Sequence, residues 1–281
     1  MKYIITAESG SDLTGEQALK HGIEVVPMHV TMGGKSYDDG TFPSRKICDY
    51  YAGHGEVPKT SASTEHDFQV VFDRIHARNP QAHILHMAYS ASTTISYNCA
   101  RMAAIGREYV TIMDTEQVSV GQGVAVQLTA DYLEQHPDLL PAEALLAAEQ
   151  ICQRIKMCFI PQDLHYLQAG GRCSSVEGFA GRLLNLHPCI EVRDGELVAT
   201  KKYRGSFKKV IPELCTEFLS GGNLKKDRLW LIGSVGLDRD SQLLAERSVH
   251  ALGYRNITWV ETGCVITAHA GPGTFGIVGT I

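Results

Sequence analysis

The sequence lacks a run of about 18 consecutive apolar residues, the length that a helix needs to cross a bilayer. It also lacks long clusters of lysine and arginine, and its formal net charge of -5 argues against a nucleic-acid-binding protein. The apolar run at the N-terminus is too short for a signal peptide, so we expect a cytoplasmic protein. With 44% hydrophobic residues, the composition predicts a soluble globular protein with a sizeable core.

The motifs of several catalytic classes are missing as well. The chain contains neither the P-loop pattern Gly-x-x-x-x-Gly-Lys-[Ser/Thr] nor a Gly-x-Ser-x-Gly elbow. No pair of its eight cysteines has the Cys-x-x-Cys spacing, and we expect free buried thiols. His83 and His86 lie three apart on an expected strand and so point to opposite faces. We therefore expect no metal and no cofactor.

Strand and helix patterns alternate from the start of the chain. Residues 3–7 and 23–26 are expected strands, and Thr14 with Gln17 forms a capping box for the helix between them. This βαβ rhythm predicts parallel pairing of the strands.

The length of 281 residues exceeds that of an average domain. Composition shifts after an amphipathic helix that is expected to end at residue 156. We therefore expect an α/β protein of two α/β domains, with residues 1–156 containing a parallel sheet and residues 157–281 forming a second α/β domain. In the second, Asp194-Gly195 predicts a hairpin and residues 176–186 an apolar helix.

Three hydroxyl-rich segments precede expected helices, at residues 59–64, 90–96 and 114–123. Helix N-termini attract anions, and the carboxyl edge of a parallel sheet is where ligands bind in open α/β folds. We expect all three segments at that edge, forming an anion site. Serine and threonine also favour N-cap positions, so simple helix capping is the alternative interpretation.

The last stretch carries a glycine-flanked histidine, His269-Ala-Gly-Pro-Gly273, between expected strands at residues 264–267 and 274–278. Gly271 and Gly273 predict a sharp backbone turn that a ligand can approach closely. We expect His269 at the end of a strand, beside exposed backbone amides.

Two arginines lie next to glycines. Gly170 and Gly171 predict a tight turn before Arg172, and Gly205 follows Arg204. Arginines on such turns suit recognition of a carboxylate or phosphate, although both also fit ordinary surface charges.

Taken together, these segments resemble the DegV family. The resemblance runs in order over essentially the whole chain, and it is carried by Ser9-Gly-Ser-Asp-Leu13, Lys59-Thr-Ser61, Asp114-Thr115 with Ser119-x-Gly-x-Gly123, Leu164-x-Tyr-Leu-x-x-Gly-Gly-Arg172, Asp194-Gly195 through Arg204-Gly205, and His269-x-Gly-Pro-Gly273.

The resemblance implies a two-domain α/β protein with a long-chain fatty acid buried between the domains. It implies a non-catalytic, lipid-binding subunit of a bacterial fatty-acid kinase. An ATP-binding kinase partner would phosphorylate the bound carboxylate to an acyl phosphate. For such a carrier we also expect transient contact with a membrane surface during lipid exchange.

The resemblance also assigns roles to residues. It implies carboxylate contacts from Thr60 and Ser61 and from the serine-rich loop that holds Ser92 and Thr94. It implies phosphoryl transfer and partner docking at Arg204 and His269, with Arg172 as a further contributor.

The sequence departs from the family pattern at two positions. Glu8-Ser9 stands where Asp-Ser is usual, and Ile95 stands where a glycine is usual. The second departure leaves open which of Ser92 and Thr94 contacts the carboxylate. Two other functions also stay open: a stand-alone small-molecule phosphotransferase that uses His269, and a lipid-binding regulatory protein without a kinase.

Overall fold

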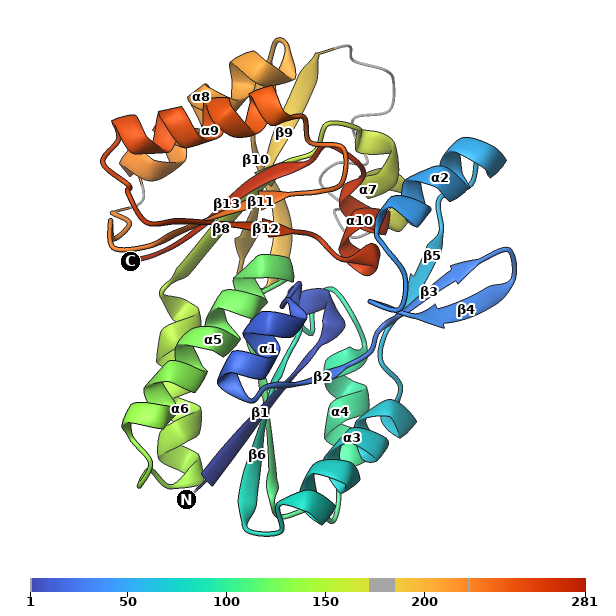
Figure 1. Ribbon diagram of the computed structural model, residues 1–281, viewed down its shortest axis with the longest axis vertical. Coiled ribbons are helices and arrows are strands. Elements are labelled where there is room, and N and C mark those ends of the chain that lie inside the picture. Colours follow the sequence, from blue (N-terminus) through green and yellow to red (C-terminus); the bar gives the residue numbers. More distant parts are fainter. Residues whose placement is uncertain (1, 172–184, 222) are drawn as a thin grey trace. The chain divides into compact units, whose positions relative to one another are not determined.

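A computed structural model describes residues 2–171, 185–221 and 223–281 (Figure 1). The chain divides into two compact units, unit 1 with Met1–Thr41 and Thr60–Arg154 and unit 2 with Phe42–Lys59 and Ile155–Ile281. The units differ from the expected domains in two respects, because residues 42–59 belong to unit 2 and the boundary falls between Arg154 and Ile155, two residues before the expected one. Both units combine helices with a sheet, so the α/β class that the sequence predicted is confirmed.

Unit 1 is built on a four-stranded sheet in the order β2-β1-β6-β7. All three pairings are parallel, which confirms the pairing that the βαβ rhythm predicted. The strands are β1 (Lys2–Glu8), β2 (Glu24–Val26), β6 (Ala82–Ala88) and β7 (Val110–Asp114).

Helices cover both faces of this sheet, with α3 and α4 on one side and α1, α5 and α6 on the other (Figure 1). Thr14 caps α1 through the predicted capping box with Gln17. Phe68 and Phe72 of α3 lie in the buried core against β6. The elements are a 3-10 turn, η1 (Ser9–Ser11), and helices α1 (Gly15–His21), α3 (Glu65–Arg78), α4 (Ser96–Ala104), α5 (Ser119–Gln135) and α6 (Pro141–Gln153).

A separate three-stranded sheet has the order β4-β3-β5, with β3 (His29–Met32), β4 (Lys35–Asp38) and β5 (Lys59–Ser61). It corrects one expectation, because residues 59–61 form a strand of this small sheet and do not follow a strand of the parallel sheet. Threonine is a good strand former as well as a cap, so the sequence left both uses open for this segment.

Unit 2 is built on a six-stranded sheet in the order β10-β9-β8-β13-β11-β12. Only β11 and β12 pair in parallel, and the other pairings are antiparallel. The predicted hairpin at Asp194-Gly195 is confirmed, with both residues at positive φ. The strands are β8 (Ile155–Ile160), β9 (Leu186–Arg193), β10 (Glu196–Arg204), β11 (Leu229–Gly233), β12 (Ile257–Glu261) and β13 (Phe275–Thr280).

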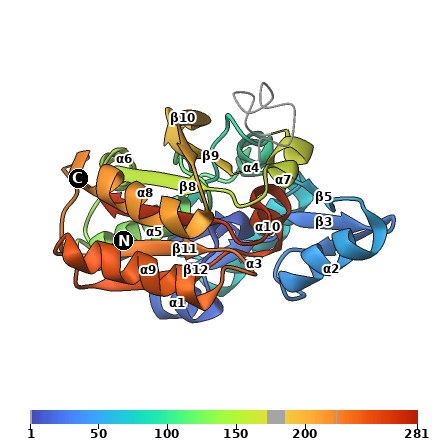
Figure 2. The same ribbon diagram turned by 90° about the horizontal axis from the view of Figure 1, so that it is seen from above.

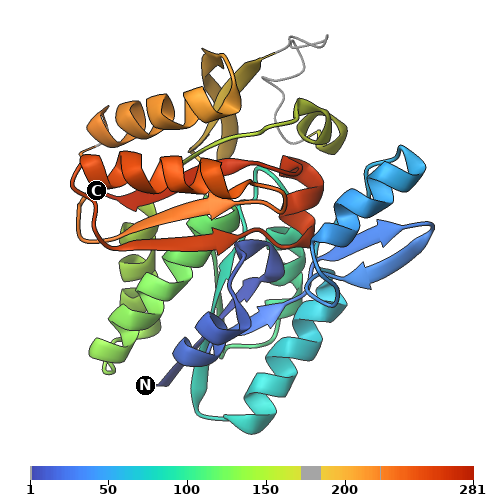
Figure 3. The same cartoon turned by 45° about the horizontal axis from the view of Figure 1, so that its top comes forward.

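The helices of unit 2 form two groups. Helices α8 (Phe207–Gly221) and α9 (Arg239–Ala251) lie side by side along the sheet and bury its apolar core (Figure 3). Helix α10 (Cys264–Ala270) packs on α7 (Leu164–Gly170) and on α2 (Arg45–His54), and Figure 2 shows α10 next to α7. These contacts explain why residues 42–59 belong to unit 2.

The predicted strand at residues 264–267 was wrong, because this segment forms the first turn of α10. Its run of Cys, Val, Ile and Thr has strand propensity, but short apolar runs do not distinguish a buried strand from a buried helix. Most of α10 is buried, and tertiary packing overrides the propensity. The predicted strand at residues 274–278 is confirmed as β13. The predicted helix at residues 176–186 lies almost entirely outside the described residues.

Candidate functional site

The carboxyl edge of the parallel sheet carries a loop that connects β6 to α4. Residues 89–96 are called the head-group loop, because the family resemblance implies that Ser92 and Thr94 of this loop contact the carboxylate head group. Helix α3 leads into β6 and α4 leads out of it, so both helices begin at this edge of the sheet. The segment that precedes α3 therefore approaches the same edge as the head-group loop.

A buried carboxylate holds the head-group loop at both ends. Glu8, at the end of β1, accepts hydrogen bonds from the backbone N–H of Tyr89 at 2.9 Å and from the hydroxyl of Ser96 at 2.7 Å. Gln122 of α5 donates a third bond through Nε2 at 2.9 Å. His86 places its Nε2 3.5 Å from Oε1 of Glu8, and both side chains are fully buried.

The charge state of Glu8 follows from these contacts. Burial by itself would raise the pKa of the Glu8 carboxyl. The neighbouring His86 and the hydrogen bonds from Ser96 and Tyr89 outweigh burial and hold the pKa below its ordinary value of 4.5. Thr6 contacts His86 from behind, with 2.9 Å between Oγ1 and Nδ1. Glu8 is therefore a fixed negative charge beneath the loop.

Within the loop, Ser92 is exposed and Thr94 is half-buried. Oγ1 of Thr94 accepts a hydrogen bond from the backbone N–H of Ser96 at 3.3 Å. An acceptor role leaves the hydroxyl proton of Thr94 able to donate to a ligand. The Ser96 hydroxyl donates to Glu8, and the Thr93 hydroxyl donates to the Ser90 carbonyl oxygen at 3.0 Å. Ser92 and Thr94 remain the predicted anion contacts of this loop.

Thr60 and Ser61 lie on β5, four and three residues before the cap of α3. The capping residue is Thr64, whose Oγ1 accepts from the Asp67 N–H while Asp67 accepts from the Thr64 N–H at 2.7 Å. Ser63 is tied to the Pro27 carbonyl oxygen at 2.7 Å. Helix capping, the alternative interpretation for Thr60 and Ser61, is therefore served by Thr64.

The third hydroxyl-rich segment is occupied by the protein's own groups. The Ser119 hydroxyl donates to the Asp12 carboxylate at 2.5 Å. A Cβ atom at Gly123 would overlap the Ser11 carbonyl oxygen, so the first turn of α5 packs directly on the residues after β1. The sequence predicted an anion site at the N-terminal ends of three helices. At the N-terminal end of α5, the anion is the protein's own Asp12 carboxylate.

In unit 2, the two glycine motifs of the sequence meet. A Cβ atom at Gly170, the last residue of α7, would overlap Nδ1 of His269 in α10. His269 is half-buried in the last turn of α10 and does not follow a strand as expected. The imidazole lies against the backbone of α7 at the one position where a side chain is absent.

The turn after His269 packs on α7 and on the segment just before it. A Cβ at Gly271 would come within 2.8 Å of the Tyr166 ring, and one at Gly273 would overlap the Gln162 amide. Both glycines have positive φ, as the predicted backbone turn required. Tyr166 and Gly170 are four apart in α7 and share one of its faces, and Gln162 lies in the segment just before the helix, so these three residues together contact His269 and the turn after it.

A buried serine fixes this turn to the sheet. The Ser234 hydroxyl, at the end of β11, donates to the Gly271 carbonyl oxygen at 2.7 Å and accepts from the Thr274 N–H at 2.8 Å. The turn is therefore held on one side by α7 and on the other by β11.

Arg204 is exposed at the end of β10 and pairs with Leu186 of β9. The strand pairings place the carboxyl ends of β8, β10 and β11 and the amino end of β13 along one edge of the sheet. Arg204 and the His269 turn share that edge, with β10 and β13 three strands or roughly 14 Å apart. Arg172 lies outside the described residues.

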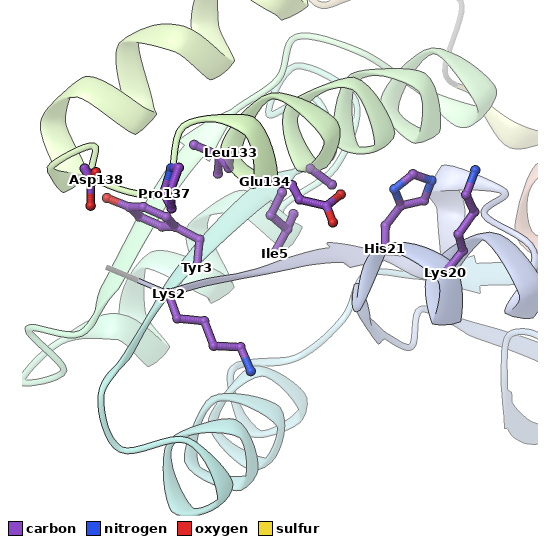
Figure 4. Close-up of a pocket in the computed structure, with 10 residues that line it drawn as sticks. Lys2, Tyr3, Ile5, Lys20, His21, Leu133, Glu134, Pro137 and Asp138 are labelled. Atoms are coloured by element: carbon purple, nitrogen blue, oxygen red, sulfur yellow. The ribbon is translucent and has the colours of Figure 1, made fainter.

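A pocket of about 510 Å³ lies elsewhere in unit 1, at the amino end of β1 (Figure 4). Ile5 and Glu134 lie in its middle, with Lys20 and His21 towards one end and Tyr3 towards the other. Its lining combines lysines with carboxylates and contains none of the predicted head-group residues.

Three absences hold for the part of the chain that the structure describes. No group of three or more His, Cys, Asp or Glu side chains there is arranged to hold a metal ion. No helix there has both the length and the apolar character needed to cross a membrane. The seven cysteines in that part form no disulfide with one another.

Sequence reasoning missed the group formed by Glu8, His86 and Gln122. Glu8 stood out only as a departure from the family pattern, and the three residues are far apart in the chain. The available signal was an ionisable residue at the end of an apolar strand, where an unpaired charge would be costly to bury.

The chain is similar to known proteins over nearly its full length. The chain is 27% identical over 286 residues to a DegV domain-containing protein of Deinococcus radiodurans, covering 99% of this chain and 98% of that protein. The solved structure of a fatty-acid-binding DegV family protein from Thermus thermophilus matches with a TM-score of 0.88 and 27% identity, covering 100% of this chain and 99% of that one. DegV, a fatty-acid-binding protein from Bacillus subtilis, shares the fold with a TM-score of 0.82 at 21% identity, covering 100% of both chains. The sequence model of the DegV family matches residues 2–280, and the chain therefore belongs to the DegV family.

Proposed function

We propose that this protein binds a long-chain fatty acid and presents its carboxylate to an ATP-dependent kinase partner, which forms an acyl phosphate. The observation that carries the proposal is the full-length likeness to the fatty-acid-binding protein of Thermus thermophilus. In this proposal the protein carries the lipid in the cytoplasm, and its contact with a membrane surface is transient.

The head group would be held by hydroxyls. Thr60, Ser61, Ser92 and Thr94 are the proposed donors, and Thr94 has a hydroxyl proton to donate. Burying a carboxylate costs several kcal/mol unless charge-assisted hydrogen bonds replace its water. Neutral hydroxyls supply those bonds and leave the carboxylate negative, which a phosphoryl acceptor needs. A bidentate arginine would bind more tightly but would neutralise the nucleophile.

The acyl chain supplies most of the affinity. Each buried methylene contributes about 0.8 kcal/mol, so a long chain contributes about 10 kcal/mol before ordering costs. That gain supports a carrier that retains its ligand between encounters with a partner.

Phosphoryl transfer would use the edge of the unit 2 sheet. Arg204 and His269 are proposed to stabilise the charge on a transferring phosphoryl group or to dock the partner that delivers it. Arg172 is proposed to contribute beside them. The packing of His269 on Gly170 supports this role, because a fixed imidazole needs no reorganisation when the charge develops.

The test combines two measurements on one purified sample. Mass spectrometry of an organic extract should detect a long-chain fatty acid at about one per protein. Incubation with ATP and a kinase subunit from the same organism should then yield acyl phosphate, trapped as its hydroxamate.

The outcomes separate the proposal from the two other functions. Repeated absence of an acyl chain would overturn lipid carriage. Lipid without any phosphorylation by the partner would favour a regulatory protein. Phosphoryl transfer by the chain alone, lost in His269→Ala, would identify a stand-alone phosphotransferase.

A further inference from the structure

We propose that Glu8 is a positioning residue of the head-group site, whose buried carboxylate sets the spacing of the two ends of the head-group loop. Through that loop it would orient the Ser92 and Thr94 hydroxyls toward the carboxylate of the ligand. This inference rests on the proposed function of fatty-acid binding.

The two carboxylate oxygens of Glu8 bind opposite ends of the loop. Oε2 accepts from the Tyr89 N–H, where the loop begins. Oε1 accepts from the Ser96 hydroxyl, where the loop ends and α4 starts. The rigid carboxyl group therefore fixes the distance between the two ends of the eight-residue loop, Tyr89 and Ser96.

The carboxylate is itself held in place. Gln122 bridges Oε2 of Glu8 and the Met87 carbonyl oxygen, with Nε2 2.9 Å from each. Nε2 of His86 lies 3.5 Å from Oε1 of Glu8, and the His86 ring makes T-shaped contacts with Phe68 and Phe72. Glu8 therefore joins β1, β6, α5 and the start of α4.

Glu8 acts on the ligand through the loop. Its side chain is fully buried, which excludes direct contact with a bound fatty acid. Ser96 connects it to the site, since the Ser96 N–H donates to Oγ1 of Thr94. A shift of Ser96 would therefore move the Thr94 hydroxyl.

A purely structural role explains this arrangement poorly. Buried ion pairs can often be replaced by apolar side chains without loss of stability. A carboxylate that accepts three directed hydrogen bonds from both loop ends and α5 instead specifies one loop geometry. The hydroxyls that it orients need such precision, because hydrogen bonds weaken steeply away from their preferred angles.

The test compares two ligands that share an acyl chain, palmitate and hexadecanol. Glu8→Gln should weaken palmitate binding about tenfold or more, as expected when donors to a charged group are displaced. Hexadecanol needs no carboxylate donors, and its affinity should change by about twofold or less. Ser96→Ala should shift the same ratio in the same direction, and it keeps the proposal testable if Glu8→Gln does not fold.

Asp73→Asn is the matched control, because it removes a carboxylate of unit 1 that pairs with Arg107 away from the loop. It should leave the ratio of the two affinities unchanged. Equal losses of affinity for palmitate and hexadecanol in the Glu8 and Ser96 variants would overturn the inference. Glu8 would then only stabilise the core. Unchanged palmitate affinity in both would also overturn the inference while leaving lipid carriage intact. If the unmodified protein bound neither ligand, the proposed function itself would fail and the inference with it.

Discussion

The imidazole of His269 lies directly against the backbone of Gly170, where any Cβ atom would overlap Nδ1. This contact joins the last residue of α7 to the last turn of α10. It gives the Gly-Gly motif a physical meaning, because glycine is the only residue that leaves room for the histidine in this position.

Gly170→Ala should therefore disturb the His269 turn. Adding one methyl group to a packed contact typically costs about 1–3 kcal/mol in the free energy of unfolding. Thermal or denaturant unfolding measures this loss. Gly53→Ala is the control, because Gly53 lies in α2 with nothing near its Cβ position. The control should be neutral or stabilising by up to about 1 kcal/mol, and equal stability of both variants would contradict the packing.

Ser234→Ala should loosen the turn from its other side. It removes a buried hydroxyl that bonds both Gly271 and Thr274. The two backbone groups left without that partner should cost about 1–3 kcal/mol of stability. Ser248→Ala is the comparison, since Ser248 only bonds back to Leu244 within α9 and should be near neutral. A Ser234 variant as stable as the Ser248 variant would show that the turn has other support.

The roles of the hydroxyls before α3 can be separated by substitution. Thr64→Ala removes the cap and should lower stability by about 1 kcal/mol with little effect on lipid affinity. The double variant Thr60→Ala with Ser61→Ala should do the reverse, weakening fatty-acid binding by about 1–3 kcal/mol. Fluorescent fatty-acid titration and thermal unfolding of both variants provide the comparison. Unchanged lipid affinity in the double variant would assign the head group to Ser92 and Thr94 alone.

His269→Ala and Arg204→Ala should separate lipid carriage from phosphoryl transfer. Both variants should purify with fatty acid, because neither residue lies in the proposed hydroxyl site, yet they should fail to support acyl-phosphate formation. Arg193→Ala serves as the control, an exposed arginine at the opposite end of the same hairpin that pairs with Glu191. Parallel loss of lipid and activity would identify a structural role, and full activity would remove both residues from the site.

Low pH should reduce the free energy of unfolding, in part because Glu8 takes up a proton. Its pKa in the folded state lies below the ordinary value of 4.5, so the unfolded chain takes up a proton first as the pH falls. The stabilisation is fully present above about pH 4.5 and is lost as the pH falls through the folded pKa. Glu8→Gln should be less stable than the unmodified protein at pH 7, and the difference should shrink below about pH 4.5. Urea unfolding at a series of pH values measures it, and a constant difference would show that Glu8 does not titrate with folding.

Local features of this protein and the direction of its strand pairing followed directly from the sequence. The Thr14 capping box, the Asp194-Gly195 hairpin and the parallel pairing of β1 with β2 and β6 all agree with prediction. Each depends on residues a few positions apart or on the alternation of strand and helix. The family could also be recognised from the sequence, because its motifs occur in chain order over nearly the full length.

Long-range packing decided the rest. Residues 264–267 have strand-like side chains, yet they begin a helix because they are buried against α7 and α2. Glu8 gains its partners Tyr89, Ser96 and Gln122 from positions 81, 88 and 114 residues away. Local propensity is a property of neighbouring residues, whereas the cost of burying a carboxylate is decided by groups that only the folded chain brings into contact.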